Sequence, residues 1–138
     1  MKNSDIKKKE KELKEYYDSL PDWYWKHGLH DAEIIDIKEY NRPDRLLRAS
    51  DYNYLQIRLN CSNALYENDI TALHFYNYRV ISGNYNSLMK EAVGSWWFSD
   101  EPTVLDDGTI KIMLVLKDSN NNDLKYTIQC DRVQIIRR

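Results

Sequence analysis

The chain has 138 residues, of which 42% are hydrophobic and 30% charged, a composition typical of one folded domain rather than a disordered segment. Its formal net charge is −2, whereas a nucleic-acid-binding domain normally carries an excess of Lys and Arg, so we expect no nucleic-acid partner. Residues 1–17 lack the apolar stretch of a signal peptide, and no run of 18 apolar residues occurs, so we expect a cytoplasmic protein with no membrane partner.

The first 20 residues predict a helical arm, with a helix over residues 4–19. Ser4 is a suitable N-cap, and Pro21 ends the helix. The apolar positions form one narrow stripe on a charged rod, made of Ile6, Leu13, Tyr17 and Leu20. Because the Lys and Glu charges nearly cancel, we interpret the remaining surface as a solvated face.

From residue 30 to residue 138 the apolar period is two, which predicts a β-rich body within a single domain that spans residues 1–138. A first strand is expected at 33–39, where Ile35 and Ile37 alternate with polar residues. A second strand at 54–61 places its apolar side chains on one face, namely Leu55, Ile57, Leu59 and Cys61.

A third strand is expected at 70–81, with Leu73 and Phe75 pointing inward and the pattern blurred near Asn77, which indicates a bulge. A short helix at 87–93 with Gly94 as its C-cap follows.

The final third of the chain predicts more strands. Residues 95–99 read as a short strand, and residues 105–117 as a central strand that begins with an Asp107-Gly108 turn and is apolar on both faces. Residues 118–123 form the clearest hairpin loop. The last strand, 124–136, needs a bulge at Asp131 or Arg132 to keep its apolar residues in phase.

These elements predict an α+β fold that is mainly antiparallel β. The N-terminal helix is followed by a curled sheet, a barrel or a small sandwich of about five to six strands, with one short inserted helix. Two cysteines make neither a disulfide framework nor a zinc set, and we interpret Cys61 and Cys130 as buried free thiols, with a cross-strand disulfide as the alternative.

The stretch "HGLHDAE" is the one candidate for chemistry, because it gathers His27, His30, Asp31 and Glu33. The spacing matches no established zinc motif, and His74 is the only other histidine, so we expect no metal and no cofactor. A His–Asp pair can act as a base and its orienting group, but no activated nucleophile or phosphate loop accompanies it.

We therefore favour a structural interpretation of this stretch. Just before a strand, Asp31 can fix a turn by accepting backbone N–H bonds, and His30 can donate to a carbonyl and pack on Trp23 or Trp25.

The stretch "GLHDAEIIDIKEY" resembles the opening of small bacterial β domains in which an apolar residue precedes His-Asp-x-x-Ile/Val and a strand. Some of these domains are immunity proteins of polymorphic toxin systems. The resemblance covers about residues 27–136, although its specific part is His30, Asp31 and Ile34. It implies a β-type fold and a protein-binding role, and it supplies no catalytic residue.

Eleven tyrosines and four tryptophans are many for this length. Most suit cross-strand pairs in a sheet, but five lie on polar phases or in adjacent positions, and these are the candidate binding surface: Tyr54, Tyr76, Tyr78, Trp96 and Trp97.

The function expected from these observations is a non-enzymatic protein-binding module. Its specific form would be an immunity-type inhibitor with acidic groups at the rim of its binding face. Its partner would be another protein, and a homo-oligomer through an edge strand is compatible with the pattern. One alternative is a small-ligand or carbohydrate-binding module that uses a Tyr/Trp face. A second alternative is a metal-dependent enzyme that uses His27, His30 and Asp31.

Overall fold

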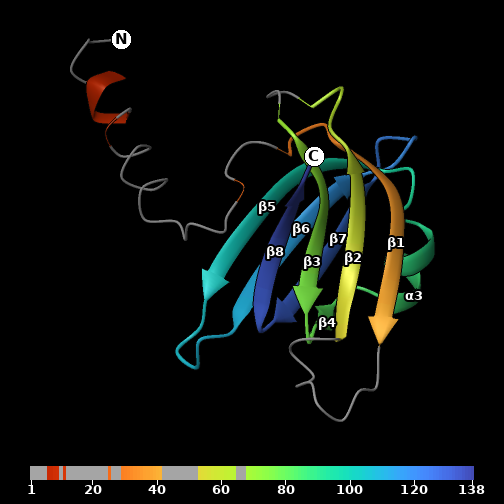
Figure 1. Ribbon diagram of the computed structural model, residues 1–138. Coiled ribbons are helices and arrows are strands. Elements are labelled where there is room, and N and C mark those ends of the chain that lie inside the picture. The colour runs from red at the N-terminus through yellow and green to blue at the C-terminus, as the bar shows by residue number, and fades with distance from the viewer. Residues whose placement is uncertain (1–5, 10, 12–24, 26–28, 42–52, 65–67) are drawn as a thin grey trace.

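The computed structural model describes residues 6–9, 11, 25, 29–41, 53–64 and 68–138. Within this part the chain forms a curled antiparallel sheet of eight strands in the order β4-β7-β6-β5-β1-β2-β3-β8 (Figure 1). The strands are β1 (Glu33–Asn41), β2 (Asn53–Asn60), β3 (Ile70–Tyr76), β4 (Arg79–Ser82), β5 (Trp96–Val104), β6 (Ile110–Lys117), β7 (Asp123–Cys130) and β8 (Arg132–Arg137). The mainly antiparallel β prediction is confirmed.

Two short helical segments accompany the sheet. Residues 6–9 and 11 are helical, and the remainder of the predicted arm helix, with Ser4, Leu13, Tyr17 and Leu20, lies outside the described residues. Helix α3 (Tyr85–Lys90) lies two residues earlier than predicted, because the Asn84 side chain caps it by accepting from the N–H groups of Asn86 and Ser87. Gly94 is not its C-cap, since the helix already ends at Glu91.

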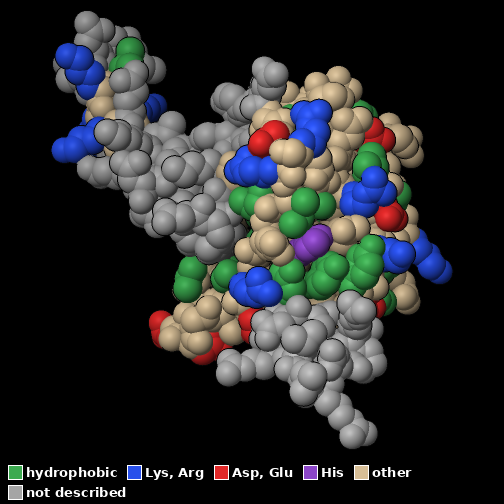
Figure 2. Space-filling view, in the orientation of Figure 1, with side chains coloured by type: hydrophobic (Ala, Val, Ile, Leu, Met, Phe, Trp, Pro, Cys, Tyr) green, Lys and Arg blue, Asp and Glu red, His purple; other side chains and the backbone are tan. Residues whose placement is uncertain are grey.

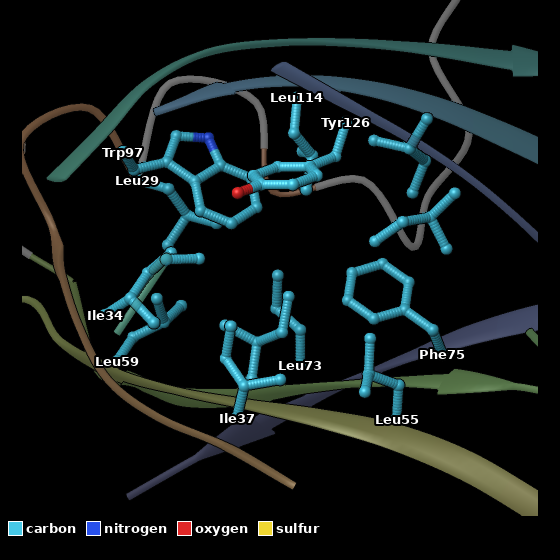
Figure 3. Packing of buried hydrophobic residues seen from close by; sticks show 14 of the residues in the cluster. Leu29, Ile34, Ile37, Leu55, Leu59, Leu73, Phe75, Trp97, Leu114 and Tyr126 are labelled. Carbon is cyan, nitrogen blue, oxygen red and sulfur yellow. The ribbon is translucent and has the colours of Figure 1, made fainter. Parts of the chain in front are cut away.

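The core lies between two halves of the curled sheet. Strands β1, β2, β3 and β8 form one half, and β5, β6, β7 and β4 form the other (Figure 1). Figure 3 shows Trp97, Leu114 and Tyr126 of the second half facing Leu73 and Phe75 of the first. All five side chains are buried, so the apolar faces that the strand patterns predict do meet in one core.

The sheet has eight strands rather than five to six because two predicted strands are each divided at a corner. The chain passes from β3 to β4 at Asn77, which has a φ of 50°, and from β7 to β8 at Asp131. β3 pairs with β8, whereas β4 pairs with β7 in the other half. The Asn77 side-chain amide donates to the Asp131 carboxylate at 3.1 Å, so the predicted bulge positions are the two facing bends of this corner.

Strand β1 has a bulge that the sequence pattern did not indicate. Ile34 pairs with Leu59 and Asp36 with Arg58, which leaves Ile35 as an extra residue. Ile34 and Ile37 are consequently buried, while Ile35 is 40% exposed. The prediction that Ile35 and Ile37 share the inward face is therefore wrong.

The other strand predictions are confirmed in their main features. Leu55, Ile57 and Leu59 of β2 are buried together. β6 lies between β5 and β7, which makes it a central strand, and the Asp107-Gly108 turn connects it to β5. β5 itself is longer than the predicted strand at 95–99.

No helix among the described residues is both long enough and apolar enough to cross a membrane.

Candidate functional site

The stretch from Leu29 to Ala32 forms a tight turn. The Ala32 N–H donates to the Leu29 carbonyl at 2.9 Å, and Asp31 adopts a φ of 69° at the third position of this turn. A positive φ at that position is required in a type II turn, and Asp tolerates it better than most residues do. The local role of Asp31 is therefore set first by its backbone.

The same turn fastens the start of β1 to the start of β5. The Asp31 N–H donates to the Trp97 carbonyl, and the Trp97 N–H donates to the Ala32 carbonyl, both at 2.8 Å. Ile34 continues the ladder by donating to Ser95 at 2.9 Å and accepting from Gly94 at 2.7 Å. The two halves of the sheet are joined here by main-chain bonds, whereas the sequence interpretation assigns this role to the Asp31 and His30 side chains.

The side chains of the motif do less than we expected. The His30 Nδ1 atom lies 3.2 Å from an Asp31 carboxylate oxygen without the geometry of a hydrogen bond. The His30 ring lies beside Phe98, with 5.7 Å between ring centroids. Trp23 lies outside the described residues, so the expected contact between His30 and Trp23 stays a prediction.

Of the described members of the proposed metal set, His30 and Asp31 lie close together and Glu33 does not join them. Glu33 is in β1, opposite both Asn60 and Trp96, and His27 lies outside the described residues. Within the described part of the chain, no three His, Cys, Asp or Glu side chains come close enough to hold a metal ion. His30 and Asp31 instead line a hollow of about 380 Å³, together with Trp96, Phe98, Lys117 and residues of the 118–121 loop.

A half-buried carboxylate, that of Asp100 in β5, contacts two tryptophans. One Asp100 oxygen accepts hydrogen bonds from the indole nitrogens of Trp25 at 2.8 Å and Trp97 at 2.7 Å. The two indole rings meet edge to face, 5.5 Å apart. Burial raises the pKa of Asp100 to about 7, and the indole donors oppose that rise because they stabilise the charged carboxylate. Sequence reasoning missed this contact, since Trp25 and Asp100 are 75 residues apart.

The outer face of the first half carries two rows of aligned side chains. In the first row, cross-strand pairing aligns Tyr40, Tyr54, Tyr76 and Arg132, one from each of β1, β2, β3 and β8. In the second row it aligns Lys38, Gln56, His74 and Gln134 in the same strand order. We call these eight residues the tyrosine face. Figure 2 shows this side of the molecule, with hydrophobic and aromatic side chains around a histidine and Lys and Arg at the margin.

The rings of the tyrosine face stack against one another. Tyr54 lies between Tyr40, at a centroid distance of 4.9 Å, and His74, at 4.4 Å, and both neighbours are nearly parallel to it. The Arg132 guanidinium lies 3.6 Å from the Tyr76 ring centroid, and the Lys38 ammonium lies 5.2 Å from that of Tyr40. The ring faces are therefore occupied by neighbours, as expected for cross-strand pairs.

Hydrogen bonds connect the two rows. The Gln56 carbonyl oxygen lies 3.0 Å from His74 Nε2, and the Tyr76 hydroxyl donates to the Gln134 carbonyl oxygen at 2.7 Å. The His74 Nδ1 atom is buried and has no hydrogen-bond partner among the residues that the structure describes. Burial lowers the pKa of His74, which favours the neutral ring with its proton on Nε2.

The five predicted surface aromatics do not form one site. Tyr54 and Tyr76 are both on the tyrosine face, Tyr54 half-buried and Tyr76 buried under its neighbours. Tyr78 lies beyond the corner and packs against the core, and burial raises its pKa. Trp97 is buried in the core, and Trp96 lines the hollow beside His30.

Tyr40 and His74 are members of the tyrosine face that the sequence interpretation left out. The alternation along β3 already placed His74 on the same face as Tyr76, but Tyr40 lay past the predicted end of the first strand.

Both cysteines are free thiols, as predicted. Cys130 is buried, and burial raises the pKa of its thiol to about 12. Cys61 is half-buried, with a pKa that burial also raises. A raised pKa keeps a thiol protonated and unreactive at neutral pH.

No protein-family model, no curated protein and no solved structure matches this chain.

Proposed function

We propose that the protein is a non-enzymatic module that binds another protein through the tyrosine face. The observation that carries this proposal is the row of Tyr40, Tyr54 and Tyr76 on the outer side of adjacent strands. The outer face of an antiparallel sheet is usually polar where it meets water. Aromatic residues and Arg on a surface are typical of the residues that supply most of the free energy of binding at protein interfaces.

The arrangement of the rings favours a protein partner over a sugar or a nucleic acid. Base stacking requires an open ring face, and sugar rings pack on aromatic faces in a similar way. Here both faces of Tyr54 are covered, by Tyr40 and His74. Tyr40 and Tyr54 are half-buried, and stacked Tyr side chains combine apolar ring edges with a polar hydroxyl, which suits a protein surface that offers both apolar contacts and hydrogen-bond partners.

The arrangement of the motif residues favours binding over catalysis. The backbone of Asp31 and Ala32 holds β1 against β5, so this stretch already has a structural task. The metal-dependent alternative would need a third ligand beside His30 and Asp31, and no His, Cys, Asp or Glu among the described residues completes such a set.

The specific form that we propose is an immunity-type inhibitor, acting in the cytoplasm by steric block of its partner. This form rests on the resemblance of residues 27–136 to the immunity-type β domains. A four-stranded face that hydrogen bonds hold rigid needs little reorganisation on binding, which favours a tight complex.

The test is affinity capture from a lysate of the source cell with three purified forms of the protein. The wild type is compared with the double variant Tyr40→Ala/Tyr54→Ala and with a control, Tyr85→Ala, which removes an exposed tyrosine of α3 outside the face. We expect one stoichiometric partner with the wild type and the control, and at least a tenfold weaker complex with the double variant.

Urea unfolding of all three forms separates lost binding from lost folding. Equal capture of the partner by the folded double variant would place the interface elsewhere. Capture of no partner by any form would contradict a stable protein complex under those growth conditions.

A further inference from the structure

The tyrosine face carries positive charge in a chain whose net charge is negative. Among its eight residues, Lys38 and Arg132 are cations and none is a carboxylate, whereas the whole chain has a formal charge of −2. Both cations are exposed. In the next row Asp36 lies opposite Arg58, so that row adds no net charge.

The side-chain amides of Gln56 and Gln134 add hydrogen-bond donors to the face. Their carbonyl oxygens already accept from His74 and Tyr76, and each amide also carries an NH₂ group. An amide NH₂ group can donate two hydrogen bonds and a Lys ammonium three. A surface of this kind is complementary to a partner that is rich in acceptors and negative charge.

We propose that the partner's contact with this face is an acidic segment of extended chain. This inference rests on the proposed function and deepens it, since it names the chemistry of the protein that binds there. Its carboxylates would pair with Lys38 and Arg132, and its backbone or side-chain oxygens would accept from Gln56 and Gln134. The apolar parts of the segment would lie on the edges of Tyr40 and Tyr54.

The positions of the two cations set the spacing of the acids. Lys38 is on β1 and Arg132 is on β8, and these strands are three steps apart in the order β1-β2-β3-β8. Neighbouring strands are about 4.8 Å apart, which places the two residues roughly 14 Å apart across the strands. Lys38 is in the second row and Arg132 in the first, which adds about 7 Å along the strand direction, so the full separation is roughly 16 Å. An extended chain rises about 3.3 Å per residue, so the acids should be about five residues apart. The segment would cross the strands rather than run along one of them.

A nucleic acid could supply negative charge too, but the covered ring faces provide no stacking platform for its bases. The acidic protein segment is therefore the occupant that the geometry favours, and a single-stranded oligonucleotide serves as the competing probe.

The experiment is selection of binders from a displayed library of random 12-residue peptides, followed by affinity measurement with synthetic copies of the selected peptides. Four forms of the full chain are compared: wild type, Lys38→Glu, Lys38→Glu/Arg132→Glu, and Lys111→Glu/Lys125→Glu. The last form reverses two cations on the outer face of β6 and β7 and is the matched control. The single variant keeps the contact of Arg132 with Tyr76, so it is informative even if the double variant unfolds.

We expect the wild type and the control to select peptides with Asp or Glu about five residues apart. We expect the double reversal to weaken their binding by about 2- to 30-fold, which is the loss of two exposed ion pairs, and the single reversal to weaken it less. Binding should also weaken as salt is raised from 0.05 to 0.5 M, because exposed charges are screened.

Three results would overturn the inference. Peptides that lose binding with Tyr40→Ala/Tyr54→Ala but show no acidic bias would leave the tyrosine face as an interface and refute its charge preference. Failure to select any acidic peptide that depends on the two cations would refute it as well. Tighter binding of a 20-residue oligothymidine than of the peptides would assign the charge to a nucleic acid, while the capture experiment would still report separately on protein binding.

Discussion

Substitution of Asp31 tests whether the motif is needed for its backbone or for its carboxylate. Asp31 has a φ of 69°, and its N–H group bonds to Trp97 whatever its side chain is. A left-handed conformation costs an L-residue about 1–2 kcal/mol, a cost that glycine does not have. Asp tolerates the conformation better than Ala does, so Asp31→Ala should lower the free energy of unfolding by about 1 kcal/mol.

Asp31→Gly has two opposing effects. Glycine removes the strain of the positive φ, but it gains about 0.5–1 kcal/mol of conformational freedom in the unfolded chain. The two terms nearly cancel, so the free energy of unfolding of this variant should lie within about 0.5 kcal/mol of the wild-type value. For a chain of this length 1 kcal/mol corresponds to roughly 3–4 °C in the midpoint of thermal unfolding.

Urea unfolding and thermal unfolding of both variants, with partner capture as the functional readout, measure these differences. If Asp31→Ala and Asp31→Gly are equally stable, the positive φ is not the reason for the residue at this position. If Asp31→Gly is as stable as the wild type but captures no partner, the carboxylate itself has a function and the structural interpretation is refuted.

Three further predictions concern single groups. Burial raises the pKa of Asp100 to about 7, so the folded state binds this proton more tightly than the unfolded state does; the stability that results is present at low pH and is lost as pH rises through about 7. The variant Asp100→Asn should show a flatter dependence of the urea midpoint on pH between 4 and 8, and an unchanged slope would contradict the burial. Burial lowers the pKa of His74, so the stability that its neutral ring contributes is present above the usual histidine pKa of about 6.5 and is lost as pH falls below that value. His74→Phe should remove this loss of stability in the same titration. If the loss persists in the variant, another group causes it. Gly83 has a φ of 83°, and a Cβ there would lie 2.6 Å from the Lys125 carbonyl oxygen and 2.8 Å from a Tyr126 ring carbon. Gly83→Ala should therefore lower the free energy of unfolding, measured in urea, by about 2 kcal/mol or more. A neutral change would mean that the turn after β4 shifts freely.

Local patterns were sufficient where a strand has one buried face and a well-defined turn. The alternation in β2 predicted that Leu55, Ile57 and Leu59 would be buried together, and they are. Asp107-Gly108 predicted the turn before β6 because glycine adopts the φ of 86° that this turn requires. These features depend on residues that are neighbours in the chain, and a single sequence contains that information.

Pairing between distant strands was decided by the tertiary structure. Whether Asn77 is a bulge or a corner depends on whether the chain after it continues along β8 or crosses to β7, and the alternation is the same in both cases. In β1 the extra residue Ile35 reverses the phase, because the backbone of Ile34 is held by Gly94 and Ser95, which directly precede β5.

The candidate site depends on the same long-range pairing. The sequence by itself determined that Tyr54 and Tyr76 point away from the core, since each lies on the polar phase of its strand. Only the register of four strands decided that they align with Tyr40 and Arg132 in one row, and only tertiary packing brought Trp25 to Asp100. Register is set by the packing of apolar faces and by main-chain hydrogen bonds between segments far apart in the chain, which no local pattern contains.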